Sequence, residues 1–262
     1  MLKNRILAIT TALTLLAGSY TAAGAAELKV VSAGALRPAL QELIPAFEKA
    51  SGHKVSIEYQ TAGKVAEKVA GEDTIDVAIV TKPAFDKLAR AAKMVAGSET
   101  PLGRQLIGLA VKKGAPKPDI SSVDAMKKTL LAAKSITYTD PASGAADAIQ
   151  FAQGLEKLGI AAELKAKTKL VTPVAGLQGG PVAAAVQRGE AEIGIQPIGV
   201  LMEAQGVDVV GPLPAELQSP DYTFIAGNPW TAEQAMAANA LLSFLKSPEA
   251  KAVYKKHGME PG

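Results

Sequence analysis

Four short segments rich in Gly, Ala, Ser and Thr each stand between an apolar run and a stretch of helical pattern. They read SAGALRPAL (32–40), YQTAGKVAEK (59–68), TDPASGAADAI (139–149) and AGLQGGPVAAA (175–185). Small residues at a helix start leave the first backbone N–H groups uncovered, and these groups have no partner within the helix. Because they also carry partial positive charge, each segment has the chemistry of an anion site, although one alone is ordinarily a cap or a turn.

The elements around these segments alternate between strands and helices, which the hydrophobic period distinguishes. The first series has predicted strands at 28–33, 55–60 and 76–81 and helices at 36–50, 64–70 and 84–92. The second series has predicted strands at 104–113, 135–140, 192–198, 207–213 and 222–227 and helices at 121–133, 145–158, 181–188, 231–246 and 248–257. Such alternation is typical of mostly parallel, doubly wound sheets.

We therefore predict an α/β fold of two doubly wound, Rossmann-like lobes joined by crossing hinge strands. Residues 27–105 and 223–262 form the first predicted lobe and residues 106–222 the second, with the hinge near 104–112 and 221–227. Ligands of open α/β sheets bind at the carboxyl ends of the strands, so the small-residue segments of both lobes can meet in one cleft. The prediction is a small anion clamped between lobes that close on it.

The first 26 residues have the three parts of a secretory signal peptide. Lys3 and Arg5 precede an apolar stretch at 6–17, and Ala23, Gly24 and Ala25 form a small-residue cleavage site. The chain contains no cysteine, so neither a disulfide framework nor a lipid-bearing cysteine is expected. We predict export to the periplasm, with unanchored secretion as the alternative.

Composition excludes several classes of partner. The 28 basic and 25 acidic residues nearly balance, which argues against binding to nucleic acid or to an anionic membrane surface. Aromatic residues make up only 4% of the chain, too few for the stacked rings of a carbohydrate-binding face. No feature of the sequence indicates oligomerisation, and a monomer is expected.

The sequence gives little support to an enzyme. Its two histidines, His53 and His257, lie in no nucleophile or metal spacing, and the common hydrolase, metalloprotease, phosphate-loop and dinucleotide motifs are absent. Asp140 and Asp147 alone do not make a metal site. We therefore expect no catalytic residue, no metal and no cofactor; a carboxylate-based active site is the one catalytic alternative left open.

Four stretches resemble a known family. They are KVVSAGALRPALQELIPAFEKASGHKVSIEYQTAGKVAEKVAGEDTIDVAIVT (29–81), DPASGAADAIQFAQGLEKLGI (140–160), VQRGEAEIGI (186–195) and LLSFLKSPEAKAVYKKHGM (241–259). The chain is similar to extracytoplasmic solute-binding proteins of ABC transporters with the type II periplasmic fold, most closely to the molybdate-binding family. The resemblance implies capture of a small anionic solute and its delivery to an ABC permease in the inner membrane. A binding protein that reports to a membrane sensor is an open alternative.

The resemblance also implies a set of ligand donors, from which this chain departs. The serine hydroxyls that hold the oxyanion in the family fall on Ala35 and Ala62, with Thr61 and Gly63 beside the second, and the family's tyrosine falls on Pro197. Since a hydrogen bond to a charged group contributes about 1.5–3 kcal/mol, three missing side-chain donors would weaken a molybdate site by orders of magnitude.

Backbone donors of the second lobe are implied to remain. They fall near Ala145 or Ala146 and at Gly179, where the side chain is irrelevant to an N–H group. Ser143 lies beside the first of these positions and Gln178 precedes the second. The second lobe can therefore still contribute to an anion site.

New polar groups accompany the missing ones. Arg37, Lys64, Gln178 and Gln196 occur at or beside the implied site, and the planar fork of arginine suits a carboxylate. We therefore predict a small organic carboxylate as the ligand, with molybdate or tungstate as the alternative.

Each of these polar residues also has a purely structural interpretation. Arg37 and Lys64 can be solvated helix residues paired with Glu42 or Glu67. Thr61 and Ser143 can be helix caps, and Gln178 and Gln196 can bond only to loop backbone.

Overall fold

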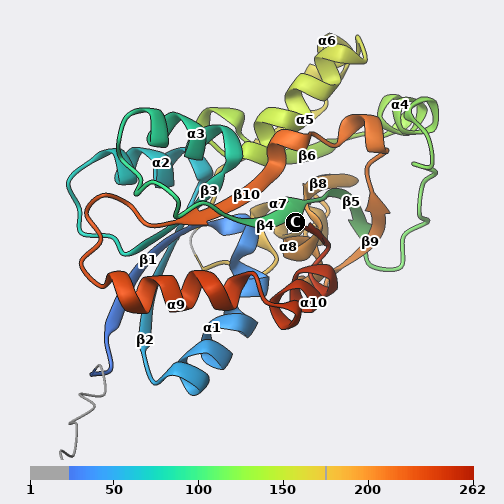
Figure 1. Ribbon diagram of the computed structural model, residues 1–262. Helices are drawn as coiled ribbons and strands as arrows, with labels where there is room; N and C mark the ends of the chain where they lie inside the picture. The colour runs from blue at the N-terminus through green and yellow to red at the C-terminus, as the bar shows by residue number, and fades with distance from the viewer. Residues whose placement is uncertain (1–23, 175) are drawn as a thin grey trace, which may run out of the picture.

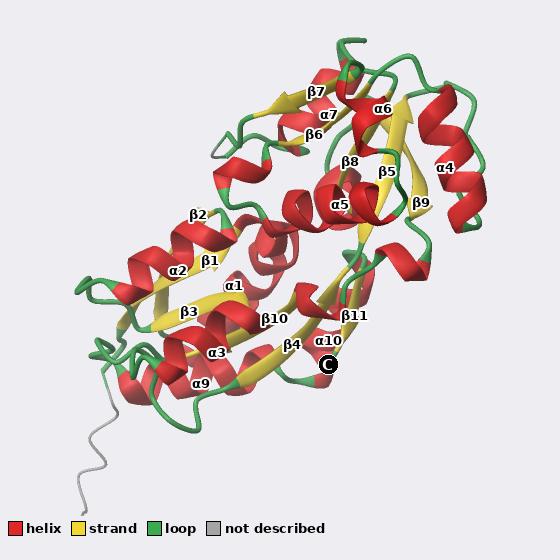
Figure 2. Ribbon diagram, turned by 90° about the horizontal axis from the view of Figure 1, so that it is seen from above, coloured by secondary structure: helices red, strands yellow, loops and turns green. Residues whose placement is uncertain are grey.

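The computed structural model describes residues 24–174 and 176–262, so all but the last three residues of the predicted signal peptide lie outside the described residues. The chain folds into two α/β lobes, each built around its own sheet (Figures 1 and 2). Both sheets are mixed, whereas mostly parallel sheets were expected.

The first lobe holds a six-stranded sheet in the order β11-β4-β10-β3-β1-β2. Its strands are β1 (Glu27–Ala33), β2 (Lys54–Gln60), β3 (Val77–Thr81), β4 (Thr100–Gln105), β10 (Thr223–Gly227) and β11 (Met259–Pro261). Strand β1 pairs in parallel with β2 and β3, while β10 lies antiparallel between β3 and β4. The three parallel strands therefore end at one edge, where the small-residue segments follow two of them.

Helices cover both faces of this sheet. They are α1 (Arg37–Ser51), α2 (Ala62–Ala70), α3 (Lys82–Arg90), α9 (Ala235–Leu245) and α10 (Pro248–Lys256). Figure 1 shows α2 and α3 on one face and α1 and α9 on the other. Neighbouring residues of β1 point to opposite faces, so Val30 belongs to the core cluster under α1 and Val31 to the cluster under α2 and α3.

Helix α1 fixes the position of the first small-residue segment. Its apolar positions Leu40, Leu43, Ile44 and Phe47 are buried, as the helical period predicts. Pro38 stands in the first turn, and the helix ends at Gly52, whose φ of 76° is the left-handed conformation typical of a helix end. The start of α1 therefore lies at the carboxyl end of β1, with its apolar face packed in the core.

The second lobe holds a five-stranded sheet in the order β7-β6-β8-β5-β9. Its strands are β5 (Ile107–Lys112), β6 (Ile136–Thr139), β7 (Thr168–Val171), β8 (Ile193–Pro197) and β9 (Val207–Pro212), and its helices are α4 (Val123–Ala132), α5 (Ala146–Lys157), α6 (Ala161–Lys165), α7 (Gly180–Gln187) and α8 (Ile198–Met202). Strand β6 is parallel to β7 and β8, and β5 is antiparallel to β8 and β9.

The connections between the lobes differ from the predicted hinge strands. The expected strand at 104–113 is divided at Leu106 into β4 and β5, which belong to different sheets. The expected strand at 222–227 is β10 and lies entirely in the first sheet, so the chain returns within 213–222. There the Gln218 side chain bonds both backbone groups of Ile107, at 3.0 and 2.8 Å, and ties the two connections together.

The residue limits of the two lobes, 27–105 with 223–262 and 106–222, stay a prediction.

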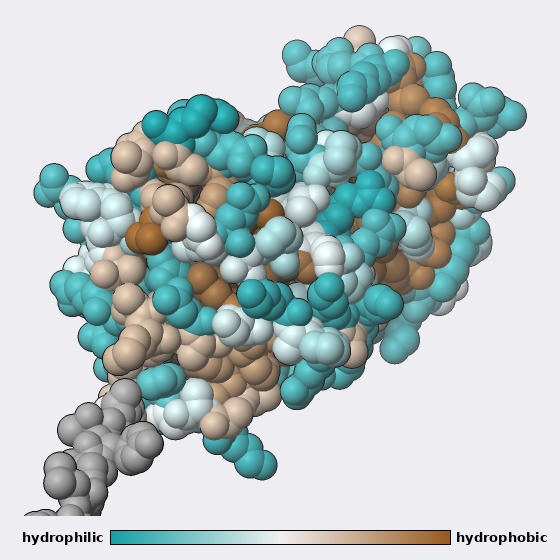
Figure 3. Space-filling view, in the orientation of Figure 1, coloured by the Kyte–Doolittle hydropathy of each residue, from teal (hydrophilic) through white to brown (hydrophobic). Residues whose placement is uncertain are grey.

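Most of the face seen in Figure 3 is hydrophilic, with apolar residues gathered over α9, where the Met236 side chain is exposed. Within the described residues, no helix has the length and apolar character needed to cross a membrane.

Candidate functional site

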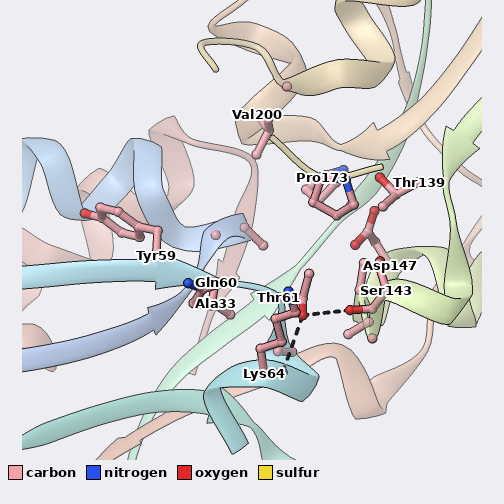
Figure 4. Close-up of a pocket in the computed structure, with 18 of the residues that line it drawn as sticks. Ala33, Tyr59, Gln60, Thr61, Lys64, Thr139, Ser143, Asp147, Pro173 and Val200 are labelled. Atoms are coloured by element: carbon pink, nitrogen blue, oxygen red, sulfur yellow. Dashed lines mark hydrogen bonds between the residues drawn. The ribbon is translucent and has the colours of Figure 1, made fainter. Parts of the chain in front are cut away.

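A cavity of about 710 Å³ lies between the lobes. All four small-residue segments contribute residues to its lining, from the starts of α1, α2, α5 and α7. Figure 4 shows side chains of both lobes pointing toward this space. Two further walls come from the end of β8 with α8 and from the segment that leads into β10. The predicted meeting of the four segments in one cleft is therefore present.

Most predicted site residues line this cavity, while their role in binding stays a prediction. Those at the lining are Ala35, Arg37, Thr61, Ala62, Gly63, Lys64, Ser143, Ala145, Gln196 and Pro197. Gln178 and Gly179 are not among the lining residues. Gln178 is exposed, and the N–H of Gly179 is directed at the Glu203 carboxylate at 3.5 Å. The neighbouring Gly180 takes the place at the cavity that was expected of Gly179.

Arg37 is tied to the opposite lobe and does not present a free fork. It occupies the first position of α1, and its side chain is only 11% exposed. Its Nη2 donates to Glu203 Oε2 at 2.7 Å and to the Leu177 carbonyl at 2.9 Å, both in the second lobe. The structural alternative, pairing with Glu42 or Glu67, is wrong because Glu42 lies with Lys256 and His257. The Nε of Arg37 is buried and has no hydrogen-bond partner among the described residues.

The start of α2 touches the second lobe directly. The Thr61 hydroxyl donates to the Ser143 carbonyl at 2.8 Å and accepts weakly from the Lys64 N–H at 3.4 Å (Figure 4). The Gly63 N–H donates to the Gly144 carbonyl at 3.1 Å. A Cβ atom on Gly63 would stand 3.2 Å from the Gly144 Cα, so a side chain at this position would require the neighbouring backbone to shift. The lobes are therefore in contact on this side of the cavity.

Two hydroxyls expected as donors are thus already engaged. Thr61 caps α2, and the Ser143 hydroxyl donates to the Asp140 carbonyl at 2.6 Å. Gln196 donates to the Gly179 carbonyl at 3.3 Å, while its Oε1 is buried without a partner among the described residues. The capping interpretation describes Thr61 correctly, and Gln196 has an unused acceptor that is itself buried.

Two tyrosines at the cavity were not foreseen. Tyr59 lies at the end of β2, and Tyr222 immediately precedes β10. Burial raises the pKa of Tyr59 to about 12, and burial together with the neighbouring Asp147 carboxylate raises the pKa of Tyr222 well above its ordinary value. Both phenols therefore keep their protons at neutral pH. Tyr59 was visible within the second small-residue segment, whereas no local signal marked Tyr222.

Asp147 is the most unusual group of the site. It is the second residue of α5, lines the cavity and is only 8% exposed. Burial raises its pKa from 3.8 to about 6, while the backbone N–H groups of Asp147 and Ala148 act in the opposite direction. Among the described residues no salt bridge compensates its charge. Sequence reasoning considered Asp147 only as a metal ligand, because burial cannot be read from spacing.

The lining combines cations, neutral donors and one buried carboxylate. Arg37 and Lys64 supply positive charge from the starts of α1 and α2, and Tyr59 and Tyr222 supply neutral hydroxyls. Several N–H groups at the starts of α2 and α5 are already engaged within the protein. Within the described residues, no group of three His, Cys, Asp or Glu side chains could hold a metal ion. The arrangement suits an anion with several separated charges, because the cations and donors stand on different walls.

The sequence has relatives of two kinds. The family described as bacterial extracellular solute-binding protein matches residues 28–260. An aconitate isomerase from Pseudomonas sp. is 34% identical over 241 residues, covering 89% of this chain and 87% of that protein. The molybdate-binding protein ModA of Azotobacter vinelandii is 28% identical over 251 residues, covering 90% of this chain and 91% of the relative.

Solved structures share the architecture. The periplasmic molybdate-binding protein of Azotobacter vinelandii superposes with a TM-score of 0.72 at 22% identity, covering 89% of this chain and 98% of that one. The sulfate-binding protein SubI of Mycobacterium tuberculosis H37Rv gives a TM-score of 0.67 at 18% identity, covering 90% and 87%. These likenesses confirm the predicted type II periplasmic fold with two α/β lobes.

Proposed function

Because the chain belongs to the bacterial extracellular solute-binding protein family, we propose that it captures a small organic polycarboxylate in the cavity between its lobes. The observation that carries this proposal is the donor set. The lining lacks hydroxyls at Ala35, Ala62 and Pro197, and it includes instead the ammonium of Lys64 and the guanidinium of Arg37, whose buried Nε has no partner among the described residues. Guanidinium and ammonium N–H groups both bind carboxylates well, although the charge of Arg37 is already paired with Glu203.

The size and spacing of the site support several carboxylates rather than one compact oxyanion. A cavity of about 710 Å³ exceeds the needs of a tetrahedral ion, whose oxygens all surround a single atom. A carbon chain bearing two or three carboxylates can place them against separate cations, Arg37 at the start of α1 and Lys64 at the start of α2. The relative named for aconitate, a tricarboxylate, supports the same class of ligand.

Molybdate or tungstate is the alternative ligand, supported by the relative that is named for molybdate. It would require Tyr59 and Tyr222 to replace the missing serine hydroxyls and the tyrosine that the family pattern places at 197.

The proposal places the protein in the periplasm, exported by the segment 1–26, where it delivers its ligand to an ABC permease or reports to a membrane sensor.

A second candidate function is the isomerisation of the bound polycarboxylate. No catalysis was expected from the sequence. One observation opposes that expectation: the relative at 34% identity is named an isomerase, and the similarity to it spans 89% of this chain. Binding and isomerisation use the same cavity, so the second function would be an addition to the first.

Ligand binding tests the proposal directly. Purified protein, unfolded and refolded to remove carried-over ligand, is titrated by calorimetry and thermal shift with cis- and trans-aconitate, citrate, tricarballylate, molybdate, tungstate and sulfate. A ligand at 100 times its Kd adds about 2.7 kcal/mol to the folded state, which a thermal shift resolves. We expect stabilisation by tricarboxylates alone; stabilisation by molybdate or tungstate without any carboxylate would refute the proposal.

Two variants distinguish a role of Arg37 in ligand binding from a role only in the contact between the lobes. Arg37→Gln removes both the cation and its interlobe bonds, whereas Glu203→Gln removes the ion pair and keeps the cation. We expect the first variant to lose tricarboxylate affinity and the second to retain or increase it. Equal losses in the two variants would assign Arg37 to lobe contact only.

A further inference from the structure

Two buried carboxylates of this protein have contrasting surroundings. Asp76 is 1% exposed and accepts hydrogen bonds from the backbone N–H groups of Lys29 at 2.8 Å, Glu233 at 3.0 Å and Gln234 at 2.9 Å. Asp147 is 8% exposed and lines the cavity, and among the described residues it has no bond of this kind to another element. Asp76 therefore has a complete structural role, whereas the surroundings of Asp147 do not explain its charge.

A helix-capping role does not explain Asp147 either. The cap position of α5 is Ala145, which makes no side-chain bond, and the carboxylate of Asp147 meets only the N–H groups of its own residue and of Ala148. An exposed acid would serve the helix start as well without desolvation. In Figure 4 the carboxyl group extends from the start of α5 into the space lined by Thr139 and Pro173.

No neighbouring ionisable group among the described residues serves as a counterion for Asp147. On the elements packed against α5, the ionisable groups are Asp140 before η2 (Pro141–Ser143), Tyr138 on β6, and Glu163 and Lys165 on α6. None of them forms a hydrogen bond or ion pair with Asp147 among the described residues. Across the cavity lie Arg37, Lys64, Glu67, Tyr59 and Tyr222, and of these Tyr222 is the one whose proton the Asp147 charge stabilises.

We propose that Asp147 is the catalytic base of a polycarboxylate isomerase, moving a proton between two carbons of the bound ligand. This inference rests on the proposed function, because it requires a polycarboxylate in the cavity. Arg37 and Lys64 hold carboxylates of the ligand, and the neutral Tyr222 beside Asp147 adds a hydroxyl. A largely buried carboxylate that lines the cavity and has no counterion among the described residues has the placement that a general base needs.

For an aconitate-type ligand, the reaction is a shift of one proton and one double bond between carbons of the same molecule. Asp147 takes a proton from the methylene carbon, and the electron pair of that C–H bond forms a new double bond to the central carbon. The pair of the former double bond moves to the other outer carbon, where its carboxylate delocalises the charge. Protonated Asp147 returns the proton to that outer carbon. The result is an aconitate whose double bond has moved and can take the other geometry, and the step needs no oxidant, reductant or cofactor.

Burial supports this role because it raises the proton affinity of the Asp147 carboxylate. Burial raises the pKa of Asp147 to about 6, so the group is ionised at neutral pH and still accepts a proton more readily than an ordinary aspartate. The rate of proton transfer is therefore expected to rise with pH through about 6 and then to level off.

Proton exchange provides the test, with the full protein and trans-aconitate as the probe. In D₂O, proton NMR follows both the loss of ligand C–H signal and the appearance of the cis isomer. Asp147→Asn keeps the shape and removes the base, and Glu67→Gln is the matched control, because Glu67 is an exposed carboxylate on the same cavity. Calorimetry with tricarballylate, which has no double bond to shift, measures binding separately.

We expect wild type and Glu67→Gln to exchange and isomerise, and Asp147→Asn to bind tricarballylate within about threefold of wild type while losing at least about 100-fold in exchange rate. Unchanged exchange in Asp147→Asn would overturn the assignment of the base. Wild type that binds without either exchange or isomerisation would overturn the catalytic inference and leave the binding proposal standing. Wild type that binds neither compound would overturn both.

Discussion

Asp147→Asn is expected to make the protein more stable at neutral pH, although it removes a group from the functional cavity. The pKa of Asp147 is about 6 in the folded protein, against an ordinary value of 3.8. A difference of about two pKa units corresponds to about 3 kcal/mol, by which the ionised group disfavours the folded state. Asparagine does not ionise, so the variant escapes this penalty.

The sign of the pH dependence follows from proton binding. Between about pH 4 and pH 6 the folded chain binds more protons at this residue than the unfolded chain, so stability falls as pH rises through that window. Below about pH 4 both states are protonated and the contribution disappears. The advantage of Asp147→Asn should therefore grow from near zero at pH 4 to about 3 kcal/mol above pH 6.

Urea denaturation followed by circular dichroism at half-unit steps from pH 4 to pH 8 measures this difference. Glu67→Gln serves as the control, because its exposed side chain is expected to change the unfolding free energy by less than about 0.5 kcal/mol at every pH. If Asp147→Asn were less stable than wild type at pH 7.5, or if the difference were the same at pH 4 and pH 8, the carboxylate would not be desolvated as we argue.

Three further perturbations test the contacts between and beside the lobes. Glu203→Gln leaves the guanidinium of Arg37 buried without its carboxylate and should lower the unfolding free energy by about 3 kcal/mol, and an unchanged urea midpoint would show the pair to be dispensable. Gly63→Val places a side chain against Gly144 across the cleft; we expect about tenfold weaker ligand binding and a larger radius of gyration by X-ray scattering, and unaltered values would contradict this. Gly180→Ala adds a methyl group at a φ of 73°, where it would meet an amide nitrogen at 2.4 Å, and should destabilise by about 1–3 kcal/mol; a thermal midpoint equal to that of wild type would refute the expected strain.

Local sequence patterns predicted most elements within a few residues. The expected helix at 36–50 is α1 (Arg37–Ser51), and the expected strand at 28–33 is β1 (Glu27–Ala33). These segments are long and strongly periodic, so their pattern is decided by neighbours in the chain. The short elements β7, α6, α8 and β11 were missed because three to five residues hold too little of any period.

The break within the expected strand at 104–113 was missed for a different reason. Residues 104–113 form one apolar run, yet the Leu106 N–H donates to the Gly258 carbonyl, and the Leu106 carbonyl accepts from Ile198 at 2.9 Å. These partners lie in segments remote in sequence, so the break between β4 and β5 depends on tertiary contacts. A hydrophobicity pattern alone cannot predict such a break.

The sequence by itself determined the two-lobed α/β fold, the resemblance to solute-binding proteins and the meeting of small-residue helix starts in one cleft. Periodicity and turn chemistry are local properties, and they suffice for such conclusions. Only the tertiary structure decided that Arg37 pairs with Glu203, 166 residues away, and that Asp147 stands desolvated beside Tyr222. Burial and long-range pairing arise when the lobes come together, and these two properties set the charge and proton affinity of the cavity.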